Sequence, residues 1–293
     1  MHRTFAFLAA ILLTTVTVSS ACLANSVEDI RFTLQRSSRQ AGEVQLSLRS
    51  GTDRHNNNMS SSFRAADLAG LDLGKLDTSG PIAFALIREA GRVDCAGNAR
   101  GRRADGDCRF TENRAFSDLL AARGMARPTQ EEAYGLTMVG ATRGLLDALS
   151  ASRYPMPTVD NYIAMSAVGV TPQYIADLTR AGYRPDASER LIEYAAIGVT
   201  PDYLGALARA GYANLPQSQV VELAALKIDP EFIRSFERIG YRNLPVDTLV
   251  QLKALEVTPE YVQAVQGSSL SAQSIDKLVQ LKAIGFEPGP RGR

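Results

Sequence analysis

The sequence GVTPDYLGALARAGY occupies residues 198–212 and returns along the chain, with the same key residues, at a constant interval. The steps from Thr171 to Thr200, to Asp229 and to Thr258 are equal, and weaker copies can be traced back to Thr142 and Phe116. A fixed period of this length is typical of a solenoid, in which each unit buries its apolar side against its neighbours. The residues that carry the pattern are Pro172, Tyr174, Gly182 and Tyr183; Pro201, Tyr203, Gly211 and Tyr212; Pro230, Phe232, Gly240 and Tyr241; and Pro259 and Tyr261.

Each unit is expected to hold two short helices. The second helix has a good N-cap followed by proline at its first position, and a glycine where a left-handed C-cap is wanted. The caps are Thr171, Thr200, Asp229 and Thr258, and the glycines are Gly182, Gly211 and Gly240. Thr129 and Glu132 predict a capping box for an earlier helix. The repeated aromatic residues are interpreted as packing between units rather than as a ligand-binding ladder.

Residues 25–111 have a different period, because apolar side chains fall at every second position. Ile30, Phe32 and Leu34 share one face, and later segments repeat this alternation. Such alternation between Gly, Asp and Ser clusters is typical of half-buried antiparallel strands. The polar stretch at 51–62 is expected to be an exposed loop, and residues 65–76 a short helical segment or turn. We therefore expect a small antiparallel β domain of about five strands.

The first 24 residues read as a secretory signal peptide, with a basic start, an apolar run from Phe5 to Val18 and a small-residue exit. The apolar run is too short for a comfortable membrane span, and no later stretch comes close, so the mature chain is expected to have no transmembrane segment. Export to the periplasm is expected; lipid anchoring through Cys22 is the alternative. Removal of Arg3 leaves 31 basic and 31 acidic residues, which gives no case for a nucleic-acid partner.

Two cysteines, Cys95 and Cys108, then remain, and an exported chain with an even number of cysteines favours a disulfide. If Gly101 and Arg102 form a two-residue turn of type II′, Cys95 faces Cys108 as a non-hydrogen-bonded pair, whose Cα atoms approach to about 4.5 Å. A competing turn at residues 105–106 would place the cysteines out of register. The first turn predicts the Cys95–Cys108 disulfide.

Residues suited to catalysis or metal binding are sparse. One of the two histidines, His2, lies in the signal peptide, and His55 lies in a polar loop, where a solvated role is the simpler interpretation. The acidic residues Asp94, Asp105, Asp107 and Glu112 miss the EF-hand spacing, and Glu131 and Glu132 are explained by the capping box. We therefore expect no catalytic residue, no metal site and no cofactor.

Arg180, Arg209 and Arg238 occupy one position in three successive units and should form a stripe along one edge. A ladder of guanidinium groups could bind a carboxylate-rich partner or an anionic polymer. The simpler explanation is that each arginine lies in the last turn of a helix, where the helix dipole stabilises a cation. In the same way, the dipole stabilises the anions Asp202, Glu231 and Glu260 in the first turns.

The motif at 198–212 and its copies resemble repeats in the extracytoplasmic regions of bacterial membrane metallopeptidase antirepressors of the β-lactam-sensor type, and in related envelope proteins. The preceding region is also similar, in particular the segments 83–97 and 106–111 with their two cysteines. The resemblance covers roughly residues 27–288. This chain lacks the peptidase's His-Glu-x-x-His helix and its membrane spans, so the resemblance implies the sensory or interaction portion and carries over no catalytic residue.

The sequence therefore predicts an α+β protein in four parts: a signal peptide at 1–24, an antiparallel β domain at 25–111, an α-solenoid of two-helix 29-residue repeats at 112–288, and a disordered tail at 289–293. The expected function is an exported, non-enzymatic binding or scaffold protein of the bacterial envelope, with a protein partner on the helical surface. The alternative is a sensor that binds a small molecule or cell-wall fragment and signals to a membrane protein.

Overall fold

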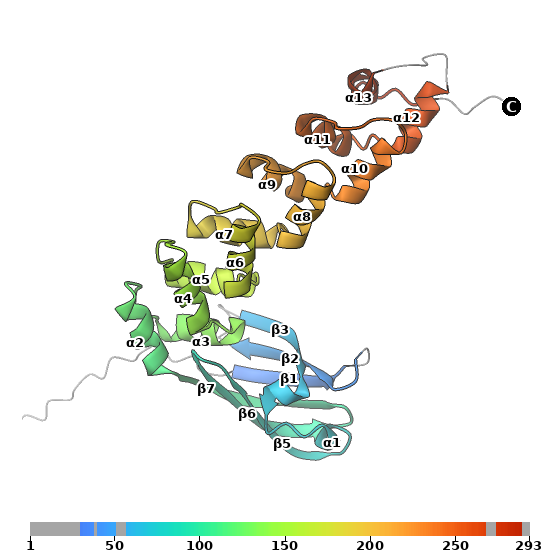
Figure 1. The fold of residues 1–293 in the computed structure, drawn as a ribbon. Coiled ribbons are helices and arrows are strands. Elements are labelled where there is room, and N and C mark those ends of the chain that lie inside the picture. Colours follow the sequence, from blue (N-terminus) through green and yellow to red (C-terminus); the bar gives the residue numbers. More distant parts are fainter. Residues whose placement is uncertain (1–29, 38–39, 51–56, 268–273, 289–293) are drawn as a thin grey trace, which may run out of the picture.

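The structure, a computed structural model, describes residues 30–37, 40–50, 57–267 and 274–288 (Figure 1). An antiparallel sheet is followed by an extended array of short helices, so the predicted α+β class is confirmed. The predicted signal peptide with Cys22, the histidines His2 and His55, and the tail at 289–293 lie outside the described residues.

Seven strands form one curled sheet within the described residues, in the order β3-β2-β1-β7-β6-β5-β4. A 3-10 turn (Ala65–Asp67) and the short helix α1 (Leu73–Leu76) lie between the third and fifth strands. The strands are β1 (Ile30–Arg36), β2 (Glu43–Ser50), β3 (Asn57–Arg64), β4 (Leu68–Ala69), β5 (Gly80–Ile87), β6 (Gly91–Arg100) and β7 (Arg103–Glu112). Their alternating apolar side chains make a core on one face of the sheet.

The sheet has seven strands within the described residues, not the expected five. The loop expected at 51–62 was wrong for residues 57–62, which belong to β3, a strand that pairs with β2 along its whole length, and residues 51–56 lie outside the described residues. The pairing is supported by polar side chains rather than apolar ones. The Gln45 Nε2 donates to the Ser60 hydroxyl at 2.8 Å, and the Ser62 hydroxyl donates to Gln45 Oε1 at 2.9 Å. Such cross-strand pairs stabilise a strand that has few apolar residues.

The β6–β7 hairpin has the predicted register, with Arg100 opposite Arg103 and Cys95 opposite Cys108. The two cysteines form a disulfide, and their Cα atoms lie 4.0 Å apart, so the pairing prediction is confirmed. The turn type was wrong, because both Gly101 and Arg102 have positive φ, which defines type I′ rather than II′. The Arg102 amide donates to the Leu76 carbonyl at 2.6 Å, and this contact holds the turn against α1.

The backbones of β6 and β7 approach closely where Gly97 lies opposite Gly106. A Cβ built on Gly97 would lie 2.0 Å from the Asp105 carbonyl oxygen, and one on Gly106 would lie 2.8 Å from the Phe32 ring. Phe32 in turn packs edge-on against Phe84, with ring centroids 5.1 Å apart. Only glycine leaves room for this approach, which lets the sheet curl around its aromatic core.

Helices of eight to ten residues make up the rest of the described chain, and two rows of them are visible in Figure 1. They are α2 (Arg114–Ala122), α3 (Gln130–Val139), α4 (Arg143–Ala151), α5 (Val159–Ala167), α6 (Pro172–Arg180), α7 (Ser188–Ala196), α8 (Pro201–Arg209), α9 (Gln217–Ala225), α10 (Pro230–Glu237), α11 (Val246–Ala254), α12 (Pro259–Gln266) and α13 (Ile275–Ala283). None of the described helices is long and apolar enough to cross a membrane.

Helices α6, α8, α10 and α12 start at equal intervals along the chain and share one capping scheme. Each begins with proline after a Thr or Asp whose side chain accepts from the amide three residues on, as predicted. Gly182, Gly211 and Gly240 have φ between 82° and 96°, as a left-handed cap requires. The capping box of Thr129 and Glu132 at the start of α3 is also confirmed.

Tyrosine hydroxyls join neighbouring pairs of helices. Tyr174, Tyr203 and Tyr261 donate to the carbonyls of residues 199, 228 and 286, at 2.7, 2.8 and 3.0 Å. The sequence separation is the same in all three hydrogen bonds, and Phe232 occupies the same place in α10 without a hydroxyl. The aromatic side chains are thus structural, with their rings among the apolar core of the array.

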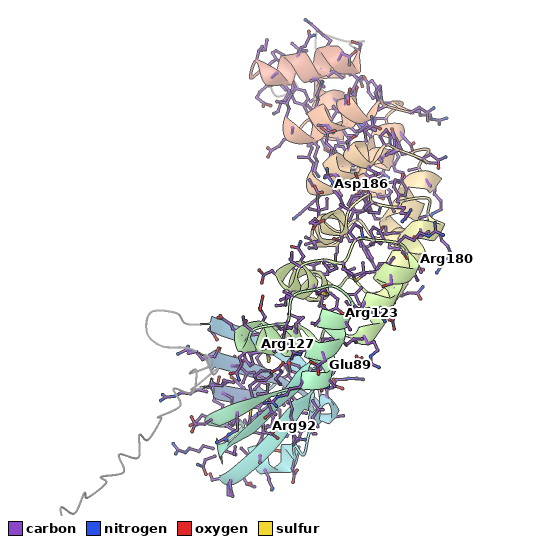
Figure 2. All side chains as sticks on the ribbon, turned by 90° about the vertical axis from the view of Figure 1, so that its left-hand side faces the viewer. Glu89, Arg92, Arg123, Arg127, Arg180 and Asp186 are labelled. Carbon is purple, nitrogen blue, oxygen red and sulfur yellow. A yellow bond between two sulfur atoms is a disulfide. The ribbon has the colours of Figure 1, made fainter. Side chains whose placement is uncertain are left out.

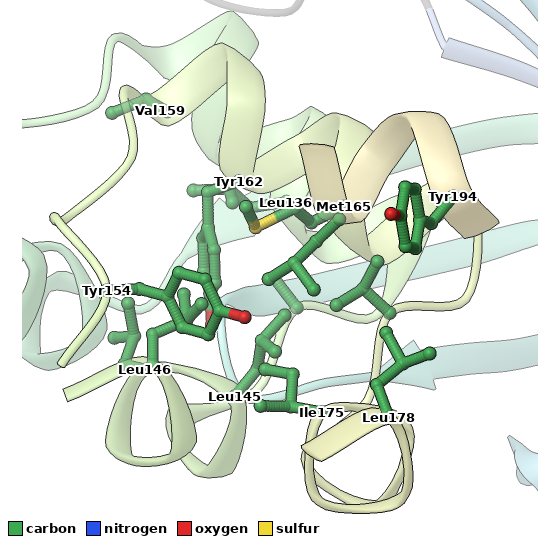
Figure 3. Close-up of a cluster of buried hydrophobic side chains, with 14 of the residues drawn as sticks. Leu136, Leu145, Leu146, Tyr154, Val159, Tyr162, Met165, Ile175, Leu178 and Tyr194 are labelled. Carbon is green, nitrogen blue, oxygen red and sulfur yellow. The ribbon is translucent and has the colours of Figure 1, made fainter. Parts of the chain in front are cut away.

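The apolar core of the helices runs from Phe116 to Val279 as two adjoining clusters, which meet around α8 and α9. Figure 3 shows part of the first cluster, where Tyr162, Met165 and Tyr194 meet leucines from the other row. All three are fully buried. Because each helix pair is too small to bury its apolar side alone, the stability of the array depends on contacts between successive pairs.

Candidate functional site

The predicted arginine stripe lies on the row of helices that contains α6, α8 and α10. Arg180 and Arg209 lie in the last turns of α6 and α8, Arg238 directly follows α10, and all three are exposed. Figure 2 labels Arg180 on this side of the array. The three side chains are therefore presented at regular steps along one surface.

Two of the three guanidinium groups already have a carboxylate partner on their own helix. Arg180 pairs with Asp177, and Arg238 pairs with Glu231 at 3.1 Å. Within the described residues Arg209 makes no ion pair, and its guanidinium lies beside Gly205. Exposed pairs of this kind contribute only about 0.2–1 kcal/mol, so an incoming carboxylate can replace the existing partner at little cost.

A second row of charges, not predicted from the sequence, lies at the starts of the helices in the other row. Acidic residues occupy the second position of α3, α5, α7, α11 and α13, and serine stands there in α9. They are Glu131, Asp160, Glu189, Asp247 and Asp276, with Ser218 in α9. The helix dipole favours these carboxylates, which explains their position without a ligand. The equal interval between them was the signal that could have revealed the row.

A pocket of 430 Å³ lies where the sheet meets the helices, between the β2–β3 hairpin and helices α3 and α5. Its apolar lining includes Leu48, Met59, Met138 and Ile163, and its polar lining includes three acidic side chains. They are Glu131, Glu132 and Asp160. The Glu132 carboxylate is engaged, because it accepts from the Thr129 amide at 2.7 Å. The lining suits a ligand with an apolar part and a cationic part.

The same junction is fixed by specific contacts. The Glu89 carboxylate, in the turn between β5 and β6, accepts from the Arg143 amide at 2.8 Å and so caps α4 (Figure 2). The Asn113 side chain donates to the Glu89 carbonyl at 2.8 Å. The rings of Phe110 in β7 and Tyr134 in α3 pack edge-on, with centroids 5.4 Å apart. Helix α3 therefore belongs to the apolar core of the sheet as well as to the array.

The polar face of the sheet carries a further shallow pocket of 530 Å³, lined by side chains of β1, β2, β3 and β7. Arg31 lies opposite Arg49 on one neighbouring strand and opposite Asp107 on the other. Asp105 and Asp107 line this pocket, whereas Asp94 is bound by Arg92 and Glu112 by the Ser117 hydroxyl. These four acidic residues are not brought together, and no group of three or more His, Cys, Asp or Glu in the described part of the chain is placed to hold a metal ion.

Burial raises the pKa of several tyrosines on the array and at the junction. The pKa of Tyr134 and of Tyr203 rises from 10.0 to about 12, because the ionised phenolate would lose its hydration. A hydrogen bond with Ser50 opposes this shift at Tyr134. These hydroxyls stay protonated at neutral pH and act as hydrogen-bond donors within the fold.

The candidate site is thus a surface with several elements rather than a single cleft: two charge rows on the helices, a pocket at the junction and a polar sheet face. Comparison with protein-family models, with curated proteins and with solved structures gives no match to this chain.

Proposed function

We propose that residues 112–288 form an α-solenoid of two-helix, 29-residue repeats, and that the chain is an exported, non-enzymatic binding or scaffold protein of the bacterial envelope. The observation that carries this proposal is the pair of charge rows, acidic at the starts of one row of helices and basic at the ends of the other. Equivalent charges at regular steps suit a long partner with its own regular charges, because each contact is weak and many act together.

The repeat proposal is tested by a pair of substitutions at one position of successive repeats. Tyr203→Phe removes the hydrogen bond to the Ile228 carbonyl and is expected to lower the free energy of unfolding by about 1–2 kcal/mol. Phe232→Tyr supplies the missing hydroxyl, for which the same sequence separation predicts the Val257 carbonyl as acceptor, and is expected to raise the free energy of unfolding by about 0.5–1.5 kcal/mol. Urea denaturation followed by circular dichroism measures both. If Phe232→Tyr lowers the free energy of unfolding as Tyr203→Phe does, the two positions are not equivalent and the repeat proposal is contradicted.

The binding role is tested by cross-linking the full chain in bacterial envelopes and purifying it with its partners. A variant with Arg180, Arg209 and Arg238 changed to Ala is expected to capture at least tenfold less of the partner than the unchanged chain does. A matched variant, with the exposed Arg109, Arg114 and Arg242 changed to Ala, has the same net charge and is expected to keep it. If both variants retain the partner equally, the basic row is not the binding surface.

A second candidate function, ligand sensing, is supported by the junction pocket. The pocket joins an apolar lining to carboxylates and lies between the sheet and the helices, where a bound molecule would contact both. If no protein is captured by the full chain, soluble cell-wall fragments are the next ligands to test, with binding measured by titration calorimetry.

A further inference from the structure

The Tyr194 hydroxyl in α7 is buried and has no hydrogen-bond partner, and it is the one buried side-chain polar atom in this condition within the described residues. The whole residue is 0% exposed. Figure 3 shows its ring beside other side chains of the buried cluster. Buried polar groups in folded proteins are nearly always hydrogen-bonded, because an unpaired one has lost its water without replacement. An orphaned hydroxyl therefore calls for an explanation.

Packing alone does not require this hydroxyl. In helices α3, α5, α9 and α11 of the same row, the positions that correspond to Tyr194 hold apolar side chains that are also buried. They are Leu136, Met165, Leu223 and Leu252. A leucine or methionine fills this place in the core of those four helices, so the phenol is a feature of α7.

Tyr194 borders a pocket of 270 Å³ between α7 and α9. The other lining residues are Asp186, Arg190, Gln217, Ser218 and Val221. The nearest helices of the row lack both charges, because the positions corresponding to Asp186 hold Pro157, Leu215 and Leu244, and those corresponding to Arg190 hold Asn161, Gln219 and Thr248. Farther along the row a charge returns at the position of Arg190, as Glu132 in α3 and Lys277 in α13. The orphaned hydroxyl thus coincides with a polar pocket that the neighbouring helices do not reproduce.

Both charges act on the hydroxyl. Burial raises the pKa of Tyr194 to about 12, Arg190 opposes this shift, and the negative charge of Asp186 adds to it. One nitrogen of the Arg190 guanidinium pairs with Glu193 at 2.6 Å, which leaves its other N–H groups for a further acceptor. Asp186 is exposed and makes no ion pair within the described residues (Figure 2). The pocket therefore presents one cation and one anion at its surface, and a neutral donor, the Tyr194 hydroxyl, lies buried beside them.

We propose that this pocket binds a small zwitterion of α-amino-acid size, with its carboxylate held by Arg190 and the Tyr194 hydroxyl and its ammonium group held by Asp186. The pocket of 270 Å³ is smaller than those that hold drug-sized ligands, which restricts it to a small molecule. Because the hydroxyl is buried in the free protein, a ligand reaches it only when the exposed Arg190 and Gln217 side chains move aside, and Gln217 then gives up its 3.2 Å hydrogen bond to the Arg184 carbonyl. This site goes beyond the proposed scaffold role and does not depend on it.

Titration calorimetry with the full chain tests the proposal directly. Glycine and both enantiomers of alanine serve as zwitterions, and acetate and methylammonium, which carry one charge each, serve as controls. At least one zwitterion is expected to bind, and to bind at least tenfold more tightly than either control. No zwitterion binding, or equal binding of zwitterion and acetate, would overturn the proposal.

Tyr194→Phe separates a ligand site from a structural water that satisfies the hydroxyl. Removal of an unpaired hydroxyl is expected to raise the Tm of the free protein by about 2–4 °C and to weaken zwitterion binding about tenfold. A lower Tm would show that the hydroxyl has a permanent partner, and would overturn the argument. Tyr203→Phe is the matched control, because its hydroxyl has a partner in the Ile228 carbonyl: it is expected to lower Tm and leave binding unchanged.

Discussion

Gly97→Ala is expected to destabilise the sheet by more than about 3 kcal/mol, because one methyl group cannot fit between β6 and β7. Its Cβ would lie 2.0 Å from the Asp105 carbonyl oxygen and 2.8 Å from the Gly106 Cα, both of which are backbone atoms. Relief requires the two strands to separate, although the Cys95–Cys108 disulfide ties them together. Thermal and urea unfolding of the variant would measure the loss.

The control for this prediction lies in the same hairpin. Unlike Gly97, Gly101 has a positive φ, of 52°, and a Cβ there would meet no atom within 4 Å. Gly101→Asn is therefore expected to change the stability by less than about 1 kcal/mol, since asparagine tolerates this backbone conformation in a type I′ turn. A loss of less than about 1 kcal/mol in the Gly97→Ala variant itself would show that the two strands tolerate a methyl group there, and would contradict the prediction.

The second large expected effect is a loss of folding stability at alkaline pH. The pKa values of Tyr134 and Tyr194 rise from 10.0 to about 12 on folding, because burial disfavours the phenolate. A group whose pKa is raised in the folded state stabilises the fold fully below its unfolded pKa, and this contribution is lost as the pH rises toward the folded value. Two such shifts amount to about 5 kcal/mol, lost between about pH 10 and pH 12.

The measurement is the free energy of unfolding in urea as a function of pH, with tyrosinate absorbance recorded in parallel. The double variant Tyr134→Phe, Tyr194→Phe removes both groups and is expected to flatten the fall by about 5 kcal/mol. A curve that is unchanged in the double variant would assign the alkaline loss to other groups, such as Tyr203.

The sequence was informative for the helices because their ends depend on local chemistry. A Thr or Asp cap, the proline after it and a left-handed glycine act within one turn of the chain, so a single sequence shows them. The register of the β6–β7 hairpin was predictable for the same reason, since a two-residue turn determines which residues face each other. The disulfide followed from that register.

The errors concern contacts between distant segments. Residues 57–62 are Asn, Ser and Met, which have no strand pattern of their own, and they pair because β2 presents Gln45 and Ser47 to their hydroxyls. Gly101 followed by Arg102 matches the Gly-X preference of type II′, yet Arg102 adopts a positive φ and its amide donates to Leu76, which lies far along the chain. The acidic row could have been found from its interval, whereas the unpaired hydroxyl of Tyr194 is visible only in three dimensions.

Glu89 has a consequence for how a partner would be recognised. Its carboxylate caps the start of α4 from the turn between β5 and β6, while Phe110 and Tyr134 close the same junction by ring packing. The polar face of the sheet and the charge rows of the helices are therefore held at one angle and one separation. A molecule that contacts both surfaces would have to match the fixed distance between them, so the protein would select such molecules by their length.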